Sequence, residues 1–385
     1  MKRAITVVLL LFVLEFTLLA AAHAQFKRIG PIFVTGQPTF ATTADFNNDG
    51  IPDLAVALYY PKYIAVLLGA GDGTFPRRFF ISKTGFTNIG DLAVGDFNED
   101  GKADMVGISV GIDFYAGNGD GTFQLLSSSP FNGIGALRMV VADFNHDGHL
   151  DIATANETSQ NVSVLFGNGD GTFQPEKDYP LVSGPLELVV ADLNNDGSPD
   201  LAVSIGCSDS ICNQGEVGVL LNNQDGTFQP AVGYDAGGVI TEGIAAGDLN
   251  HDGNIDIVAT NSNYGYPSTV SVFLGHGDGT LAPAVNYMAE NGPIAVAIAD
   301  FDGDGNPDLA VSNFGSNSVS LLRGNGNGTF QSARGFGVGL GPASVLASDL
   351  NGDGKPDLVF PLLDAAHVSV FVNTAHSSSV GQSPR

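Results

Sequence analysis

Residues 349–357 read Asp-Leu-Asn-Gly-Asp-Gly-Lys-Pro-Asp, and this nine-residue pattern occurs seven times in the chain. Every copy has Asp at positions 1, 5 and 9, Asn or Asp at position 3, and Gly at position 6. Asp, Asn and Gly are also common in ordinary turns, but seven copies with the same ninth residue favour a more specific structure. The other copies begin at Asp45, Asp96, Asp143, Asp192, Asp248 and Asp300.

The pattern predicts a set of oxygen ligands for Ca²⁺, which binds about six to eight oxygens from carboxylates, amides, backbone carbonyls and water. Side chains at positions 1, 3 and 5 converge, the Gly permits a sharp turn, and the carbonyl at position 7 and the Asp at position 9 complete the shell. The predicted ligands are Asp45, Asn47, Asp49, Ile51 and Asp53; Asp96, Asn98, Asp100, Lys102 and Asp104; Asp143, Asn145, Asp147, His149 and Asp151; Asp192, Asn194, Asp196, Ser198 and Asp200; Asp248, Asn250, Asp252, Asn254 and Asp256; Asp300, Asp302, Asp304, Asn306 and Asp308; and Asp349, Asn351, Asp353, Lys355 and Asp357.

An EF-hand is excluded by the twelfth position, because that loop needs a Glu there and a helix on each side. The flanking segments here are short and β-branched. We therefore expect strand–loop–strand sites that hold up to seven calcium ions. The residues at the twelfth position are Val56, Gly107, Thr154, Val203, Ala259, Val311 and Phe360.

The seven copies mark an internal repeat, since their first aspartates are 51, 47, 49, 56, 52 and 49 residues apart. In the sixth unit, apolar runs at 294–299, 309–312 and 318–322 and a segment from Phe330 onward are each short and bounded by Gly, Asn, Asp or Pro. Such runs are typical of strands. Seven units of four short antiparallel strands predict an all-β, seven-bladed β-propeller.

A second motif, Gly-Asp-Gly-Thr-Phe or a close variant, lies between the expected third and fourth strands of six units. Its Asp-Gly or Asn-Gly pair is typical of a tight hairpin turn with positive φ angles, and we place its Phe between adjacent blades. A metal-binding role for the turn aspartates is the alternative. The six copies are 71–75, 119–123, 169–173, 224–228, 277–281 and 326–330.

The seventh unit lacks this motif and its fourth strand. Residues 25–30 read like the segments that follow the other turns, such as 173–178. We therefore predict that the N-terminal strand completes blade seven, which closes the ring and removes an open sheet edge. The predicted domain spans residues 25–373 and is followed by a disordered tail at 374–385.

Residues 1–24 are predicted to be a removed signal peptide, with a basic start at Lys2 and Arg3, an apolar run to Ala22, and an Ala-His-Ala cleavage signal. A membrane anchor is the rival interpretation, but Glu15 interrupts the run. We expect an exported protein, located in the periplasm, at the cell surface or outside the cell. In such a protein, Cys207 and Cys212 are expected to form a disulfide.

The formal net charge is −26, and 22 of the 41 acidic residues are predicted side-chain ligands in the seven loops. Much of the acidity therefore accompanies the predicted metal sites. The remaining negative charge opposes nucleic acid and anionic membranes as partners, and no membrane insertion is expected. We expect a monomer.

The seven loops and six turns resemble the FG-GAP/VCBS repeats, which also build the propeller of integrin α subunits. The resemblance covers residues 26–373. It implies a seven-bladed propeller with calcium between the first and second strands of each blade. The family includes adhesins, binding modules of enzymes, and some lyases, so it does not fix a function.

The repetitive loops and turns are expected on one face and irregular segments on the other. Loops on a rigid scaffold commonly carry binding sites, and tyrosines are good amphipathic contacts. We therefore predict a non-enzymatic binding or adhesion module for a protein or glycan. A metal-assisted polysaccharide lyase or related carbohydrate-active enzyme is the alternative, and the sequence assigns no catalytic residue. The candidate ligand contacts are Tyr59, Tyr60, Tyr63, Tyr264 and Tyr266.

Overall fold

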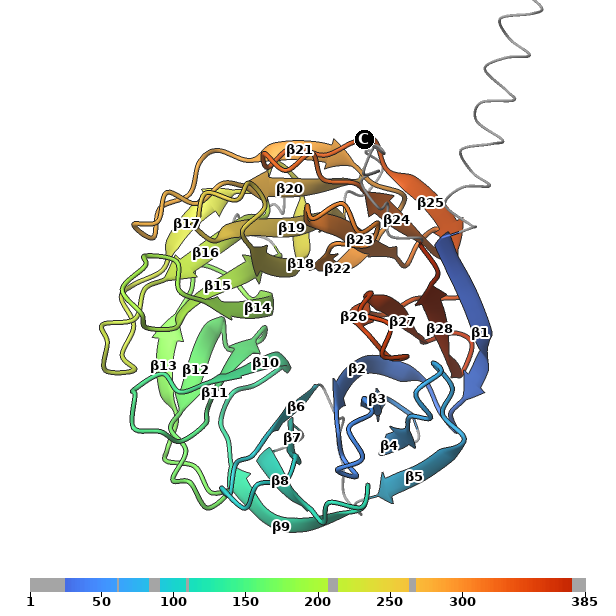
Figure 1. Cartoon of the computed structure of the whole chain (residues 1–385). Coiled ribbons are helices and arrows are strands. Elements are labelled where there is room, and N and C mark those ends of the chain that lie inside the picture. The colour runs from blue at the N-terminus through green and yellow to red at the C-terminus, as the bar shows by residue number, and fades with distance from the viewer. Residues whose placement is uncertain are drawn as a thin grey trace, which may run out of the picture.

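The computed structural model of the chain describes residues 25–60, 62–82, 91–108, 111–206, 214–262 and 268–375. Its seven four-stranded antiparallel sheets are arranged as blades around a central axis (Figure 1). The prediction of a seven-bladed β-propeller is therefore confirmed. The predicted signal peptide, Cys207 and Cys212 lie outside the described residues, as do residues 376–385 of the predicted tail.

Each blade begins with its innermost strand and ends with its outermost strand (Figure 1). The blades comprise β2 (Pro38–Ala44), β3 (Asp53–Leu58), β4 (Tyr63–Leu68) and β5 (Arg77–Ser82); β6 (Leu92–Gly95), β7 (Asp104–Ile108), β8 (Gly111–Gly117) and β9 (Phe123–Pro130); β10 (Ala136–Ala142), β11 (Asp151–Asn156), β12 (Asn161–Leu165) and β13 (Lys177–Pro180); β14 (Pro185–Ala191), β15 (Asp200–Ile205), β16 (Glu216–Leu220) and β17 (Val232–Asp235); β18 (Ile240–Gly247), β19 (Asp256–Ser262), β20 (Thr269–Phe273) and β21 (Val285–Met288); β22 (Pro293–Ala299), β23 (Asp308–Asn313), β24 (Ser318–Leu322) and β25 (Arg334–Gly337); and β26 (Leu346–Ser348), β27 (Asp357–Leu362), β28 (His367–Asn373) and β1 (Phe26–Phe33).

The core is a set of apolar layers between neighbouring blades. In blade 1, every residue of β3 is buried, which fits its continuous apolar run because both faces of the sheet are covered. Leu54 and Val56 of β3 belong to the same apolar cluster as Val359 and Val370 of blade 7. The short Val-, Ile- and Leu-rich runs of the repeats therefore specify blades that can bury their apolar area only by stacking in a ring.

The N-terminal strand closes this ring as predicted. β1 pairs antiparallel with β28, from Phe26 opposite Asn373 to Phe33 opposite His367. The sheet order of blade 7 is β1-β28-β27-β26. The backbone N–H of Thr374, the first residue of the predicted tail, donates to the carbonyl of Gln25 at 2.6 Å.

The large apolar residue that ends each Gly-Asp-Gly-Thr-Phe turn, Phe in five copies and Leu281 in one, packs between blades, as predicted. Phe123, for example, lies edge-on to Phe46 of the preceding blade, with ring centroids 5.4 Å apart. Phe173 pairs in the same way with Phe97, and Phe228 with Phe144. In blade 7, Phe26 of β1 takes this role and lies 6.0 Å from Phe301.

The backbone of these turns differs from the prediction in one respect. In the first turn, the positive φ angles belong to the two glycines that flank the aspartate, Gly71 (75°) and Gly73 (79°). Asp72 accepts hydrogen bonds from the backbone N–H and hydroxyl of Thr74 at 2.9 and 2.5 Å. The assignment of positive φ to the Asp-Gly pair is therefore right for Gly73 and wrong for Asp72, whose side chain closes the turn from a residue outside the positive-φ region.

We expect Phe26→Ala to destabilise the ring by about 3–5 kcal/mol, because it removes a buried ring from the junction of blades 6 and 7. Phe26 is buried against Phe301 and Phe336, whereas Phe33 on the same strand is 62% exposed. Guanidinium unfolding in calcium measures the effect, with Phe33→Ala as the matched control. Equal unfolding midpoints for the two variants would contradict closure through this contact.

Candidate functional site

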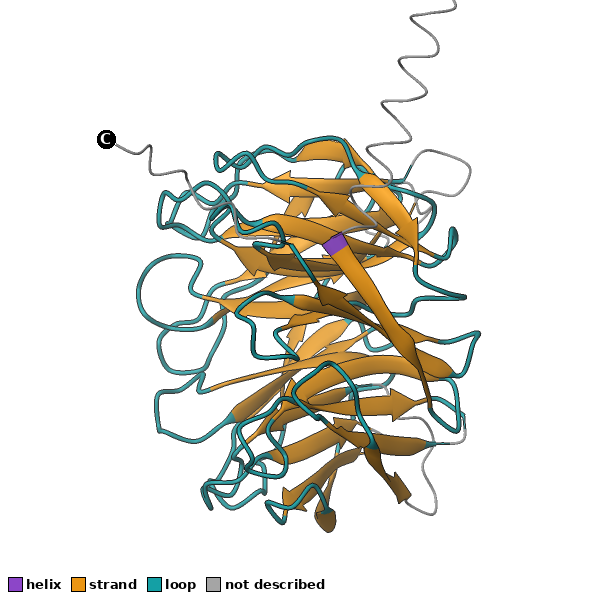
Figure 2. Ribbon diagram, turned by 45° about the vertical axis from the view of Figure 1, so that its right-hand side comes forward, coloured by secondary structure: helices purple, strands orange, loops and turns teal. Residues whose placement is uncertain are grey.

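The predicted calcium loops lie on one face of the propeller. Each joins the first and second strands of a blade, and the Gly-Asp-Gly-Thr-Phe turns join the third and fourth. Because successive strands are antiparallel, both sets of connections lie at the same end of the strands, which we call the loop face. The connections at the other strand ends form the opposite face, and Figure 2 shows the loops gathered at both ends.

In each loop, side-chain oxygens accept hydrogen bonds from the backbone of the same loop. In the first copy, the two oxygens of Asp45 accept the backbone N–H groups of Asp49 and Gly50 at 3.1 and 2.7 Å. The side-chain oxygen of Asn47 also accepts from Asp49, and Asp49 accepts from Ile51, both at 2.9 Å. The other six copies repeat the same bonds between positions 1, 3, 5, 6 and 7.

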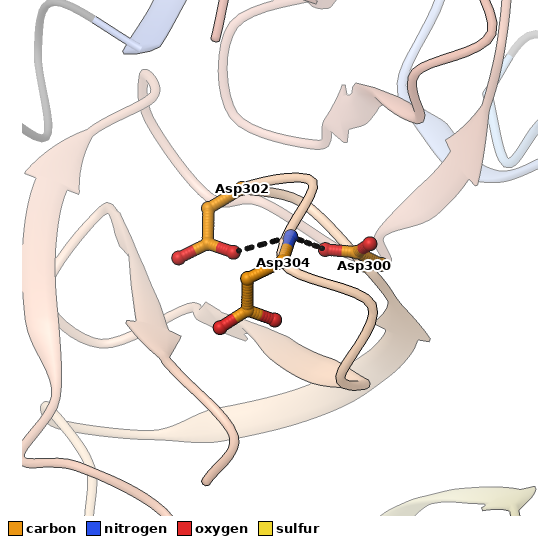
Figure 3. Close-up of side chains that lie close together, drawn as sticks. All are labelled: Asp300, Asp302 and Asp304. Carbon is orange, nitrogen blue, oxygen red and sulfur yellow. Dashed lines mark hydrogen bonds between the residues drawn. The ribbon is translucent and has the colours of Figure 1, made fainter. Parts of the chain in front are cut away.

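In the sixth loop, the predicted ligands at positions 1, 3 and 5 are brought together. One carboxylate oxygen from each of Asp300, Asp302 and Asp304 lies within 4.8 Å of the other two (Figure 3). This is the one copy with three acids at these positions, since the others have Asn at position 3. Three converging carboxylates repel one another and fit a hard divalent cation such as Ca²⁺.

The ninth aspartate has a structural role that the sequence did not reveal. Asp256, for example, is fully buried, and its two oxygens accept the backbone N–H groups of Leu249 and Gly275 at 2.9 and 2.8 Å. The bonds tie the start of the loop to the end of the third strand. The other six ninth aspartates form the equivalent pairs of bonds.

Burial raises the pKa of all seven ninth aspartates, and that of Asp308 reaches about 7. Removal of these carboxylates from water favours their neutral form, and the two N–H donors oppose this shift. Each carboxylate therefore contributes to the fold independently of any ion.

Neighbouring loops touch through positions 4 and 7. Nδ1 of His149, at position 7, lies 2.5 Å from Glu99, at position 4 of the preceding loop. This hydrogen bond raises the pKa of His149. His146 and Ser198 are 3.1 Å apart in the equivalent positions of the next pair.

The candidate tyrosines of the opposite face have different environments. Tyr59 and Tyr60, between β3 and β4, are 48% and 71% exposed. Tyr63 is partly buried and packs against the apolar layer between blades 7 and 1, which indicates a structural role. Tyr264 and Tyr266 lie outside the described residues.

Exposed large apolar side chains are absent from the loop face, as far as the described ranges extend. Those on the outermost strands are Phe33, Phe80, Leu125, Leu126, Val232, Val285 and Met288, and those at the opposite face are Tyr59, Tyr60, Ile134, Val182 and Leu340. Of the two faces, the opposite face is therefore the one whose loops expose large apolar side chains.

A charged cluster near the axis was missed by the sequence analysis. Asp91, Arg138 and Glu187 each lie five residues before the first aspartate of their blade's loop, beside or within an innermost strand. Nε of Arg138 lies 3.8 Å from Oε1 of Glu187. An alignment of the seven repeats could have revealed this cluster, because the other four blades have uncharged residues at the same position. These residues are Phe40, Gly243, Ala295 and Ser344.

Burial raises the pKa of Asp91 to about 6 and that of Glu187 to about 7, although Arg138 opposes both shifts. Asp91 accepts the backbone N–H groups of Leu92 and Met139, both at 2.8 Å, and Glu187 accepts that of Ile244 at 3.2 Å. The carboxylates thus accept N–H groups of innermost strands. Carboxylates with raised pKa values beside one arginine also mark a candidate functional cluster.

The sequence matches the model of the FG-GAP-like repeat at residues 45–107, 105–154, 143–203, 209–259, 248–311 and 300–360. The chain belongs to the FG-GAP-like repeat family. No curated protein matches the chain significantly. Within the described residues, none of the FG-GAP-like repeats contributes a helix able to span a membrane.

Several solved propellers resemble the FG-GAP-like repeats of this chain in fold. An Agrocybe aegerita lectin that recognises non-reducing terminal N-acetylglucosamine is 21% identical over 78% of this chain and 80% of its own, with a TM-score of 0.54. A streptogramin B lyase is 15% identical over 91% and 98%, with a TM-score of 0.59. BBS1N, solved in complex with ARL6DN, is 11% identical over 90% and 96%, also with a TM-score of 0.59. At these identities the likeness shows the fold alone.

Within one FG-GAP-like repeat, we expect two aspartates to respond differently to calcium. Asp252→Asn, at exposed position 5, should lower the melting temperature only in calcium. Asp256→Asn should destabilise in both calcium and EDTA, by about 2–4 kcal/mol, because the amide cannot accept both buried N–H groups. Thermal melts with a calcium count per chain measure both effects.

The wild type is the control for metal dependence. Calcium at ten times the dissociation constant stabilises by about 1.4 kcal/mol per site, so EDTA should lower its melting temperature substantially. A wild-type melt that is unchanged by EDTA, or an Asp256→Asn variant that is destabilised only in calcium, would contradict this division of roles.

We also expect Glu187→Gln to become more stable relative to the wild type as the pH rises. The ordinary pKa of this carboxyl is 4.5 and the folded value is about 7, so the folded state binds the proton more tightly. The wild type therefore loses stability between about pH 4.5 and pH 7, and the neutral amide does not. Arg138, Asp91 and Glu242 face the group and contribute to the shift.

Melting temperatures across this pH range in calcium measure the difference, and Glu157→Gln, at an exposed position, is the control. If the Glu187→Gln and wild-type curves run parallel, the carboxyl at Glu187 does not change its charge on folding in this range.

Proposed function

We propose that the protein is an exported, calcium-stabilised β-propeller that binds a glycan or a protein through its opposite face. The observation that carries the proposal is the separation of repeated and variable surfaces. The loop face has seven copies of one loop and no exposed large apolar side chain in the part described, whereas the loops of the opposite face expose five. A face made of repeated polar loops is consistent with a structural role. Exposed apolar side chains on a rigid frame are typical of a surface that binds a ligand.

Calcium enters the proposal as a structural ion. The hydrogen bonds that the Asp and Asn side chains make in every loop, and the three converging acids of the sixth loop, fit a hard cation held by positions 1, 3 and 5. The ion would offset repulsion within seven acidic loops, and its loss would weaken the frame that presents the opposite face. Export is inferred from residues 1–24, and calcium is abundant outside cells.

A glycan is one of two ligand classes that the proposal allows. The fold neighbour from Agrocybe aegerita recognises N-acetylglucosamine, so this architecture can present a sugar site. Another neighbour is solved in complex with a protein. The exposed Tyr59 and Tyr60 could pack on either kind of ligand.

A polysaccharide lyase is the second candidate, and the axial cluster favours it. Arg138 beside Asp91 and Glu187 places a permanent cation among carboxylates whose raised pKa values suit proton transfer near neutral pH. The streptogramin B lyase shows that a propeller of this size can act as a lyase. A lyase would release unsaturated sugar products, which a binding module would not.

We expect Tyr60→Ser combined with Leu340→Ser to weaken ligand binding by about tenfold or more, because the pair removes exposed apolar contact area from the opposite face. Binding of the mature chain to arrays of glycans and extracellular proteins, in calcium, identifies the ligand and measures the loss. The matched control is Val232→Ser with Met288→Ser, which removes exposed apolar groups from outermost strands. Equal loss in both variants would reject the opposite face as the binding surface.

A further inference from the structure

Positive charge on the rim of the propeller is concentrated at one place. The outermost strands β1 and β5 carry Lys27 and Arg28, and Arg77 and Arg78, and neither strand contains an acid. The other five outermost strands together carry Lys177 and Arg334, which are matched in number by Asp178 and Asp235. β1 and β5 belong to blades 7 and 1, so they are neighbours on the rim (Figure 1).

Little nearby acid offsets this charge. From residue 25 to residue 90, the acidic residues are Asp45, Asp49, Asp53 and Asp72, and all belong to the loop face. In the described part of the chain, no carboxylate lies within ion-pair distance of Lys27, Arg28 or Arg78, whereas Lys102, Arg138, Arg323 and Lys355 each have such a partner. Arg77 faces Asp120 of blade 2 and helps to lower its pKa, after the larger effect of Thr122.

The arginines are held by neutral partners. Nη2 of Arg28 donates to the hydroxyl of Ser369 at 2.9 Å, and Nη1 of Arg78 donates to the carbonyl of Phe33 at 2.7 Å. The second bond joins β5 directly to the end of β1. Each guanidinium has five N–H donors in a planar fork, so most of them stay available for the oxygens of a carboxylate or sulfate.

Aromatic rings accompany the charges. Phe33 is 62% exposed at the end of β1, and Phe80 is 39% exposed on β5. We call the surface formed by Lys27, Arg28, Arg77, Arg78, Phe33 and Phe80 the seam strip. Flat apolar rings beside arginines suit a sugar ring that has an apolar C–H face and an anionic substituent.

Protection of the sheet edge does not account for the seam strip. Charged residues on edge strands often prevent pairing between molecules. However, the outermost strands β9, β17 and β21 contain no Lys or Arg. In β1, Pro31 and the register shift between Ile29 and Ile32 already disrupt pairing along the edge.

We propose that the seam strip binds an anionic polysaccharide, sulfated or carboxylated. The inference rests on the proposed function in assigning a glycan ligand, but places it on the rim. A single flexible chain can follow two strands on a convex rim, whereas a membrane or a duplex would also meet the acidic surface of a chain whose net charge is −26. At physiological salt, screening over about 8 Å confines the interaction to the strip itself.

The test uses the mature chain in calcium and physiological salt, with dextran sulfate as the probe and neutral dextran as its uncharged match. Arg28→Gln with Arg78→Gln should weaken binding to dextran sulfate by about tenfold or more, since each ionic contact contributes to affinity. Lys177→Gln with Arg334→Gln removes the same charge from other outermost strands and should leave binding within about twofold of the wild type. Polygalacturonate in place of dextran sulfate distinguishes carboxylate from sulfate recognition.

A second variant distinguishes a loss of binding from a loss of folding, because Arg28 and Arg78 also make hydrogen bonds within the protein. Lys27→Gln with Arg77→Gln changes exposed residues of the seam strip and should weaken binding with an unchanged melting temperature. Equal binding by seam and control variants, equal binding to neutral dextran, or tighter binding to anionic vesicles would overturn the inference.

Failure of the proposed function has a different signature. Suppose that glycans or proteins bind through Tyr60 and Leu340, and that the seam variants bind dextran sulfate as tightly as the wild type does. The seam strip alone is then rejected. If no ligand binds the opposite face but the seam strip binds dextran sulfate, the proposed face is wrong and the rim is the binding surface.

Discussion

Each blade depends on a buried aspartate that receives two backbone N–H groups. The carboxylate of Asp256 bonds Leu249 at the start of the loop and Gly275 at the end of the third strand, and the arrangement recurs in all seven blades. A buried carboxylate is costly unless its oxygens are satisfied, and here two charge-assisted bonds satisfy it. The same contact fixes the angle at which the loop leaves the sheet, so this part of the loop geometry does not depend on a bound ion.

In most of the loops, the second residue extends this contact to the next blade. The N–H of Phe46 bonds Asp53 of its own blade, its carbonyl accepts the N–H of Gly121 in blade 2, and its ring packs on Phe123. Phe97, Leu193 and Leu249 accept equivalent backbone bonds. At the closure, Gln25 and Asn373 both donate to the carbonyl of Phe301. One peptide unit therefore couples loop geometry, blade spacing and ring closure, and an ion bound at one loop would stiffen two blades.

Much of the architecture could be predicted because the repeat encodes it locally. The apolar runs, the turn motifs and the missing fourth strand of unit seven specify the blade count and the closing strand. The second role of the ninth aspartate could not be predicted, since a carboxylate suits an ion and an N–H group equally well. The cluster of Asp91, Arg138 and Glu187 was missed for another reason. Strand periodicity describes one blade at a time, and these residues become neighbours only where inner strands converge on the axis.

The seam strip arises from the same topology. β1 and β5 are separated by most of blade 1 in sequence, and they become adjacent only because the first strand of the chain is the last strand of the ring. Closure brings Arg78 against the carbonyl of Phe33, and so places the two strands that carry the cations side by side. The acids of blade 1 are confined to the loop face, where the predicted calcium ions would neutralise them. A protein with a strongly negative net charge can thus carry a cationic surface, provided that its acidic residues are concentrated elsewhere, as they are here in the loops of the loop face.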